Sequence, residues 1–565
     1  MKTSTFLQQS IQTLRPWAVA GLLLAATLVA TGAEGAAGGW VTAEVALARG
    51  EYPTAARRLH EAANTSRDTA VFEKAARLAF DNAQPAELES IANDWLAREP
   101  RSEAARRFRA IARLQLDRPQ AAADDFRVLI KTAYSTPAAA FSALQESLAG
   151  AEFVGAAEIA ISDLLRDYPT TPEAWMAHAD LALHAGNSPA ALKSIERLLA
   201  LSPSNREALW LRARALVLGG NCDQGLASAA VLARDGSARD RLMHGWLASS
   251  CGRGEEAERP LKDLTRIAAL KGEALQLLAA NALDAGRLDV AEARYREALG
   301  AGGAVDVITF GMAQIAERRG QTNQAKQLYS GITEGNRAVA AQLSLYRLLM
   351  DSGDDALAAR MLDDFVAHSP ERLSVTAGRI DVLNERGHAE TALSLSARAL
   401  RVYPDDPTIT LARAATLDKS GRMDEALKIL KVLRAQRPND ALVANSLGYT
   451  LVDHDRDLST ARQLITAALA RRPDSAAIQD SYGWLLFRER HFDQAIVWLS
   501  KAYDREPQAE VAVHLGEAQW ASGDHEAAAR TWSSALMRVP DSVILKEVLG
   551  ARGVAMPDTR ASQSP

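Results

Sequence analysis

Few side chains in this sequence have the spacing that catalysis or metal binding requires. The densest group is Asp453-His454-Asp455-Arg456-Asp457, which sits in a predicted turn. Carboxylates and imidazole can bind metals, but ligands this close together on one turn rarely converge on a single ion. His525-Glu526 lacks the second His, four residues after the first, of a zinc-protease helix. We therefore predict a solvated turn at 453–457 and no metal site.

Motifs of nucleotide-dependent or covalent catalysis are missing from the sequence. It contains no phosphate-binding P-loop, no dinucleotide-binding glycine fingerprint, no nucleophile elbow and no Cys-x-x-Cys pair. We therefore predict that the chain has no cofactor and no catalytic residue and is not an enzyme.

Two cysteines occur, and they lie 29 residues apart, at Cys222 and Cys251. Cys222 starts one predicted helix, and Cys251 follows the end of the next. If adjacent helical hairpins stack, these two positions come side by side, and an oxidising compartment would favour a disulfide. The alternative is two free, buried thiols that act as small hydrophobic side chains.

The N-terminal segment indicates export. Residues 1–16 carry Lys2 and Arg15 and no acid, and an apolar run from Trp17 ends in small residues at Ala33. This is the layout of a secretory signal peptide at 1–33; the alternative is an uncleaved N-terminal anchor. Either way we expect the rest of the chain in the periplasm or cell envelope, and membrane contact only through an uncleaved N-terminal segment.

The net charge argues against nucleic acid as a partner. The formal charge is −5, and loss of residues 1–33 would remove two cations and no acid, which makes it −7. Nucleic-acid affinity depends largely on neutralising phosphates, and no dense basic stripe is present. Aromatic residues make up only 5% and Ala is abundant, which favours closely packed helices over strands.

An internal repeat organises the rest of the sequence. Prolines recur in phase after helix-like segments, first at Pro169 and Pro203, 34 residues apart. A second series has intervals of 34, 34, 35, 34 and 33 residues and consists of Pro370, Pro404, Pro438, Pro473, Pro507 and Pro540. A helix–turn–helix unit of 34 residues that ends in Pro resembles the tetratricopeptide repeat (TPR). The resemblance implies an all-α superhelical solenoid of stacked antiparallel helix pairs.

Small residues inside each unit agree with this resemblance. Counting each unit so that its Pro is residue 32, position 8 is Ala179, Gly483 or Gly516, and position 20 is Ala191, Ala495 or Ala528. Small side chains are needed there because the first helix of a unit (helix A) crosses the second (helix B) at these positions. Gly near position 15, as in Gly186 and Gly523, would end helix A with a left-handed residue.

The predicted organisation has six parts. They are the segment 1–33, degenerate TPR-like hairpins over 40–168, a central array over 169–370, a carboxyl-terminal array over 371–540, a capping helix over 541–552 and a disordered tail over 553–565. Outside the proline series, the predicted helix pairs are 69–81 with 84–97, 102–116 with 118–132, 137–150 with 154–167, 205–218 with 222–234, 237–250 with 254–267, 272–285 with 288–300, and 304–319 with 322–333.

The last three repeats place aromatic and polar side chains at positions that line the concave face of a TPR superhelix. The candidate partner-binding residues are Asn445, Tyr449, Asp480, Trp484, Phe487, Arg488, Glu517 and Trp520. A stripe of exposed aromatic side chains would mark a binding surface. The alternative is that these rings only pack between repeats.

The same region carries a second resemblance. The blocks 445–453, 480–488 and 514–520 are similar to the carboxyl-terminal repeats of Gram-negative outer-membrane TPR lipoproteins. That group includes the adaptor of a periplasmic carboxyl-terminal processing protease, to which the adaptor brings peptidoglycan hydrolases. Its members carry a lipobox Cys, which this sequence lacks.

Three functions follow as alternatives. The first is a periplasmic adaptor or scaffold that binds other proteins in its concave groove, among them a periplasmic protease or peptidoglycan hydrolases. The second is a structural subunit of an envelope assembly, for polysaccharide export or for pilus or outer-membrane biogenesis. The third is an enzyme with an unrecognised site, which the missing motifs disfavour.

Overall fold

The computed structural model describes residues 36–49, 51–65, 69–234, 236–369, 372–539 and 542–556. The predicted signal segment 1–33, Pro370, Pro540 and most of the predicted tail lie outside them. The described residues form helices and no strand, so the all-α prediction is confirmed. No helix of the described segments combines the length and apolarity that a bilayer crossing requires.

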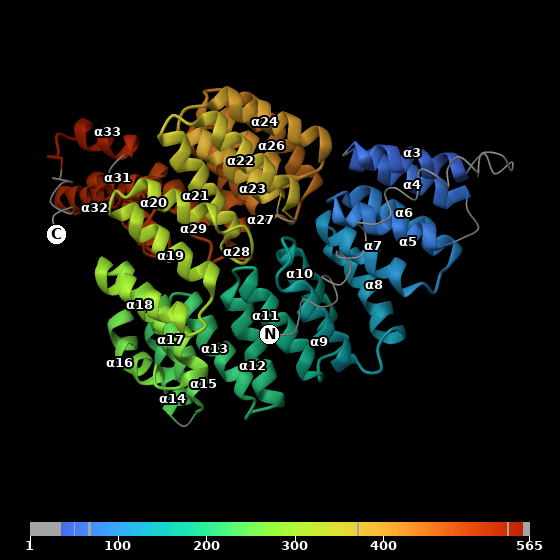
Figure 1. Ribbon diagram of the computed structural model, residues 1–565, viewed down its shortest axis with the longest axis horizontal. Coiled ribbons are helices and arrows are strands. Elements are labelled where there is room, and N and C mark those ends of the chain that lie inside the picture. The colour runs from blue at the N-terminus through green and yellow to red at the C-terminus, as the bar shows by residue number, and fades with distance from the viewer. Residues whose placement is uncertain are drawn as a thin grey trace.

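The helices follow one another with short connections (Figure 1). The first part of the chain contains α3 (Ala36–Ala48), α4 (Tyr52–Thr65), α5 (Ala70–Asp81), α6 (Pro85–Arg98), α7 (Glu103–Gln115), α8 (Pro119–Thr132), α9 (Pro137–Leu148), α10 (Val154–Leu164), α11 (Pro172–His184), α12 (Ser188–Leu201), α13 (Arg206–Leu218), α14 (Cys222–Arg234), α15 (Ala238–Ser250), α16 (Gly254–Leu264), α17 (Ala268–Asp284) and α18 (Leu288–Gly300). The second part contains α19 (Val305–Arg318), α20 (Thr322–Ser330), α21 (Ala338–Asp351), α22 (Asp355–His368), α23 (Arg372–Glu385), α24 (Ala389–Val402), α25 (Pro407–Lys419), α26 (Met423–Gln436), α27 (Ala441–Asp453), α28 (Leu458–Arg471), α29 (Ala476–Arg488), α30 (Phe492–Arg505), α31 (Ala509–Ser522), α32 (His525–Arg538) and α33 (Val543–Ala551).

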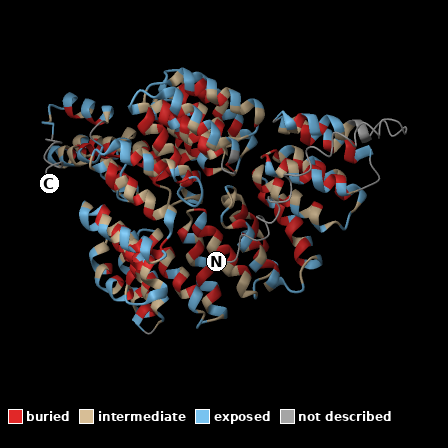
Figure 2. Cartoon of the chain, viewed as in Figure 1, coloured by how far each residue is buried: buried red, intermediate tan, exposed pale blue. Residues whose placement is uncertain are grey.

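Successive helices pack as antiparallel hairpins, and buried residues gather where neighbouring helices meet (Figure 2). The alanines predicted at position 20, Ala191, Ala495 and Ala528, are fully buried. A Cβ added to Gly483 in α29 would lie 2.6 Å from Leu499 Cγ in α30, which is closer than atoms pack. Glycine at this position therefore sets the close approach of helix A to helix B.

Left-handed residues mark the turns between helix A and helix B. In the described residues they recur about once per repeat and include Gly186 at φ 75° and Gly523 at φ 97°. Where the sequence has no glycine, Asp117 and Arg490 take the same conformation. A single residue with positive φ reverses the chain sharply enough to lay helix B against helix A.

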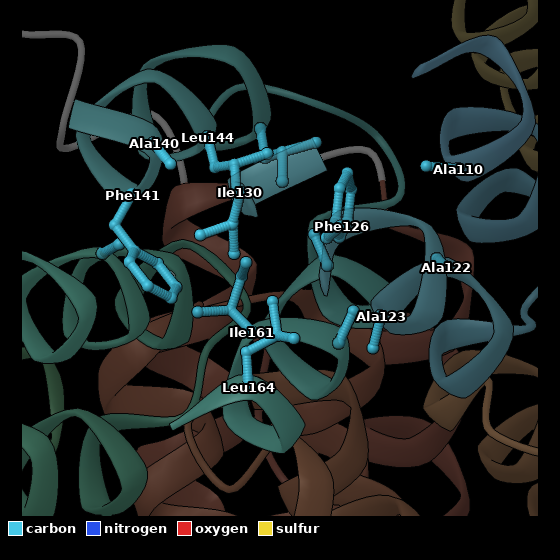
Figure 3. Packing of buried hydrophobic residues seen from close by; sticks show 14 of the residues in the cluster. Ala110, Ala122, Ala123, Phe126, Ile130, Ala140, Phe141, Leu144, Ile161 and Leu164 are labelled. Carbon is cyan, nitrogen blue, oxygen red and sulfur yellow. The ribbon is translucent and has the colours of Figure 1, made fainter. Parts of the chain in front are cut away.

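One predicted hairpin is wrong in its packing. The sequence pairs 137–150 with 154–167, but α9 packs against α11, while α10 packs against α8 and α11. Phe141, Ile161 and Leu181 join one cluster across these helices, part of which is seen in Figure 3. The physical reason is the turn, because no residue between α9 and α10 has the positive φ that closes the other hairpins.

The superhelix folds back on itself. In Figure 1 the chain runs from the blue helices through the green ones and returns through yellow to orange and red. Turns of the first half then meet loops of the second half, through the hydrogen bonds Gln84 Nε2 to Val402 O (3.1 Å), Asn439 N to Asp117 Oδ2 (2.6 Å), Ser188 N to Asp474 Oδ2 (2.7 Å) and Arg505 Nη1 to Leu218 O (2.7 Å). The loops that precede α27, α29 and α31 are thus held by the first half of the chain.

Candidate functional site

Helix A of four successive repeats forms the candidate site. Side chains of α25, α27, α29 and α31 line an open-sided cavity of about 330 Å³, which we call the helix-A cavity. Asp406 and Asp440 cap the first two of these helices: Asp406 Oδ1 accepts from Ile409 N at 2.8 Å, and Asp440 Oδ1 accepts from Val443 N at 3.2 Å. Capped, hairpin-packed helices hold the wall in place.

Three of the eight predicted residues line this cavity: Asn445, Tyr449 and Asp480. Asn445 is 8% exposed, and among the described residues its Oδ1 has no hydrogen-bond donor. The Tyr449 hydroxyl donates to Glu510 Oε1 at 3.0 Å. Burial, and then the negative charges of Glu510, Asp453 and Asp480, raise the pKa of Tyr449 well above its usual value.

Asp480 pairs with a buried histidine of the next repeat. His514 Nδ1 lies 2.9 Å from Asp480 Oδ1 and 3.1 Å from Asp480 Oδ2. Burial by itself would lower the pKa of His514, but the charge and hydrogen bond of Asp480 outweigh it, and the pKa is raised. The surroundings of the cavity therefore favour positive charge.

The predicted aromatic stripe lies beside the cavity and packs between repeats. The Trp484 ring stacks on His514 of the following repeat at 4.2 Å and on Phe487 at 4.6 Å between ring centroids. Its Nε1 donates to Asp453 Oδ1 of the preceding repeat at 3.2 Å. Both Trp484 and Phe487 remain half-buried, so the rings join neighbouring repeats without being fully enclosed.

The other three predicted residues have partners within the chain. Arg488 Nη1 donates to the main-chain oxygen of Asp453 at 3.0 Å, and Arg488 Nη2 lies 3.0 Å from Asp455 Oδ2. Glu517 accepts from Arg552 Nε at 3.2 Å. Trp520 stacks on His525 at 4.1 Å. Arg488, Glu517 and Trp520 are not among the residues that line the cavity.

Four acidic residues of the cavity wall are absent from the predicted site: Asp418, Asp453, Glu506 and Glu510. Asp453 belongs to the turn that is predicted to be solvated. Glu510 is at position 2 of its helix A, which also faces the concave side, and Asp418 is at position 12 one repeat earlier. Including the preceding repeat, and position 2 of each helix A, among the candidate positions would have identified Asp418 and Glu510. Glu506 lies in the α30–α31 loop, where the repeat phase gives no signal.

Residues of the 453–457 turn make separate contacts and do not form one common site. His454 Nε2 lies 2.6 Å from Asp418 Oδ1, and Asp457 Oδ1 accepts from Thr460 N at 3.1 Å at the start of α28. Within the described parts of the chain, no group of three or more His, Cys, Asp and Glu side chains could hold a metal ion.

The structure joins Cys222 to Cys251 in a disulfide, with their Cα atoms 6.0 Å apart. Cys222 is the first residue of α14, and Cys251 is the C-cap of α15. The bond connects two neighbouring hairpins on their turn side.

Comparisons with known proteins agree with the repeat period. Models described as tetratricopeptide repeat match residues 146–205, 176–240, 383–448 and 447–510. A protein of Pseudomonas aeruginosa, named as a TPR repeat-containing protein, is 31% identical over 214 residues. That match covers 38% of this chain and 36% of the relative, so the chain spans about a third of the relative's length.

Solved structures of low similarity also align. The crystal structure of yeast Tom70 is 12% identical, with 94% of this chain and 95% of that chain covered and a TM-score of 0.31. The Cut9–Hcn1 crystal structure is 15% identical, with 93% and 97% covered and a TM-score of 0.31. The helix pairs, the 34-residue period and the matching repeat models together show that this chain contains tetratricopeptide repeats.

Proposed function

We propose that this chain is an exported adaptor that holds a segment of a partner protein in the helix-A cavity. Tetratricopeptide repeats form a protein-interaction scaffold. The observation that supports the proposal is the cavity itself, because four successive A helices line it. Asn445 on its wall has a buried acceptor with no hydrogen-bond donor among the described residues. Repeats of this kind use side chains of successive A helices to build one continuous surface.

The finer part of the proposal is that the adaptor presents bound proteins to an envelope protease. Its support is the resemblance of 445–453, 480–488 and 514–520 to the adaptor of a periplasmic processing protease. Residues of these blocks, Asn445 and Asp480 among them, line the cavity. An adaptor of this kind needs a binding site and no catalytic group.

We place the protein in the periplasm or cell envelope. The pattern of residues 1–33 supports export, and the Cys222–Cys251 disulfide fits an oxidising compartment. Fusing residues 1–40 to a reporter enzyme that folds only when its own disulfides form tests this. Activity of the fusion, lost when Leu22 and Leu23 are replaced by Arg, is the expected result; an inactive fusion retained in the cytoplasm would contradict it.

A photocrosslinking experiment tests partner binding. A benzophenone amino acid replaces Ser446, on the cavity wall, in full-length protein expressed in its own cells. The control carries the same amino acid at Val497, which is 53% exposed on α30 and outside the cavity. We expect a crosslinked polypeptide from position 446 and little or none from 497. Equal yields at both positions, or no crosslink at 446 with normal expression, would overturn the proposal.

A further inference from the structure

The wall of the helix-A cavity is rich in carboxylates. Asp418, Asp453, Asp480, Glu506 and Glu510 line it, against Lys419 and His454 as basic groups. No Lys or Arg among the described residues lies within ion-pair distance of any of these five carboxylates, although such pairs are common elsewhere in the chain. The cavity therefore gathers carboxylates that no Lys or Arg of the described residues pairs with.

The five carboxylates are not equivalent. Asp480 and Asp418 are paired with His514 and His454. The other three, Asp453, Glu506 and Glu510, are exposed. Within the described residues, their carboxylate oxygens accept hydrogen bonds only from neutral groups: Trp484 Nε1, Gln508 Nε2 and the Tyr449 hydroxyl. These three carboxylates stay accessible to a ligand.

The second and independent observation is Asn445. Its amide is more than nine-tenths buried at the cavity wall, and its Oδ1 finds no donor within the described structure. A buried acceptor without a donor is unfavourable, because it has lost its hydrogen bond to water and gained none in exchange. Groups of this kind are almost always satisfied in folded proteins. Because the oxygen is closed off from solvent, an incoming N–H donor completes it only when the amide rotates its oxygen toward the cavity.

We propose that the helix-A cavity binds an extended segment of the partner, with an Arg or Lys side chain among the carboxylates and a backbone N–H donated to Asn445 Oδ1 after the amide rotates toward the cavity. This rests on the proposed adaptor function and names the chemistry of its partner. The Tyr449 ring on the same wall provides apolar surface for the stem of the side chain. A volume of about 330 Å³ fits one long side chain with its flanking backbone, not a folded domain.

The test uses fluorescein-labelled, end-capped peptide pools of about twelve residues with neutral flanks. The central residue is Arg in one pool, Lys in the second and citrulline, the neutral analogue of Arg, in the third. Binding to the full chain is measured by fluorescence anisotropy at about 50 mM and about 300 mM salt. We expect Arg and Lys pools to bind about tenfold more tightly than citrulline at low salt, and the difference to shrink at high salt.

Charge-neutral variants locate the effect. Asp453→Asn, Glu506→Gln and Glu510→Gln together keep every acceptor oxygen that Trp484 or Tyr449 uses, so the fold is preserved. The matched control, Glu196→Gln, Asp493→Asn and Glu547→Gln, removes three exposed carboxylates elsewhere on the chain. We expect the cavity triple variant to lose the preference for Arg over citrulline and the control to keep it.

The Asn445→Ala variant distinguishes the contribution of the backbone hydrogen bond to peptide affinity from the contribution of the charged side chain. It should weaken binding of the Arg and citrulline pools by the same factor, about fivefold or more, because both present the same backbone. Equal binding of Arg and citrulline to the wild-type chain would overturn this inference. If Ser446 still yields a specific crosslink, that result would leave the adaptor proposal standing, so the two failures are distinguishable.

Discussion

Two sets of carboxylates in this chain differ in how their charge is balanced. In the first half, Asp125 of α8 is buried, with 1% of its side chain exposed. Three arginines of α7 surround it: Arg109 Nη2 at 2.6 Å, Arg113 Nη1 at 2.8 Å and Arg106 Nη1 at 3.4 Å. In the helix-A cavity, Asp453, Glu506 and Glu510 are exposed and have no Lys or Arg partner among the described residues.

This difference in ion pairing indicates a structural role for Asp125 and a binding role for the cavity carboxylates. A carboxylate buried inside a helical hairpin must be paired with cationic side chains of the same chain, because an unpaired buried charge is strongly unfavourable. A carboxylate on an open cavity wall can stay hydrated until a ligand replaces the water. We infer that Asp125 stabilises the α7–α8 hairpin and that the cavity carboxylates contribute to binding and little to stability.

The largest effect is expected at Asp125. Asp125→Asn leaves three guanidinium groups around a neutral amide and should lower the free energy of unfolding of the first half by about 3–5 kcal/mol. Urea denaturation followed by circular dichroism measures this. Peptide binding by the cavity should not change. A loss below about 1 kcal/mol, or a weaker affinity in the folded variant, would break the distinction between the two sets.

The next effect concerns the packing that holds the cavity wall. Gly483→Ala forces a Cβ into Leu499 and should destabilise the α29–α30 hairpin by about 1–3 kcal/mol. The matched control is Gly155→Ala in α10, where an added Cβ meets nothing within 4 Å and the higher helix propensity of Ala should stabilise by up to about 1 kcal/mol. Hydrogen exchange of α29 and α10 amides measures the stability of each helix separately. A change in stability of the same sign at Gly483 and Gly155 would contradict the role given to Gly483 in helix packing.

The smallest effect is the pH response of His514. The pKa of His514 is raised in the folded chain above the usual histidine value of 6.5, so His514 binds a proton more tightly in the folded than in the unfolded chain. The stability it contributes is fully present below about pH 6.5 and is lost as the pH rises through the folded pKa. Between about pH 6 and pH 9 the wild type should therefore lose more stability than His514→Gln. An equal loss in both chains would show that the pair with Asp480 does not set the proton affinity.

Local sequence signals predicted the repeats because each repeat is decided within about 34 residues. Phased prolines and small residues such as Gly483 and Ala495 fix where a helix stops and how closely its neighbour packs. The separation of α9 from α10 was missed, because Gly150 and Gly155 look like a turn while neither adopts a positive φ. Glycine permits that conformation without enforcing it.

Contacts between distant repeats could not be predicted in the same way. Asp117 and Asn439 are 322 residues apart, and nothing in either repeat marks it as the other's partner. The candidate site shows the same limit. The repeat phase places Asn445, Tyr449 and Asp480 on one wall, but whether Trp484 faces solvent or stacks on His514 depends on the angle between neighbouring hairpins. That angle is set by the packing of both.

The most direct test of the cavity as a site for a cationic segment is the attachment point of the photocrosslinker on the partner. With the benzophenone at position 446, mass spectrometry identifies the partner peptide and the residue to which it is bound. We expect an Arg or Lys within about two residues of the crosslinked residue, because the cavity holds one long side chain and its flanking backbone. Attachment within an acidic or uncharged segment would contradict it.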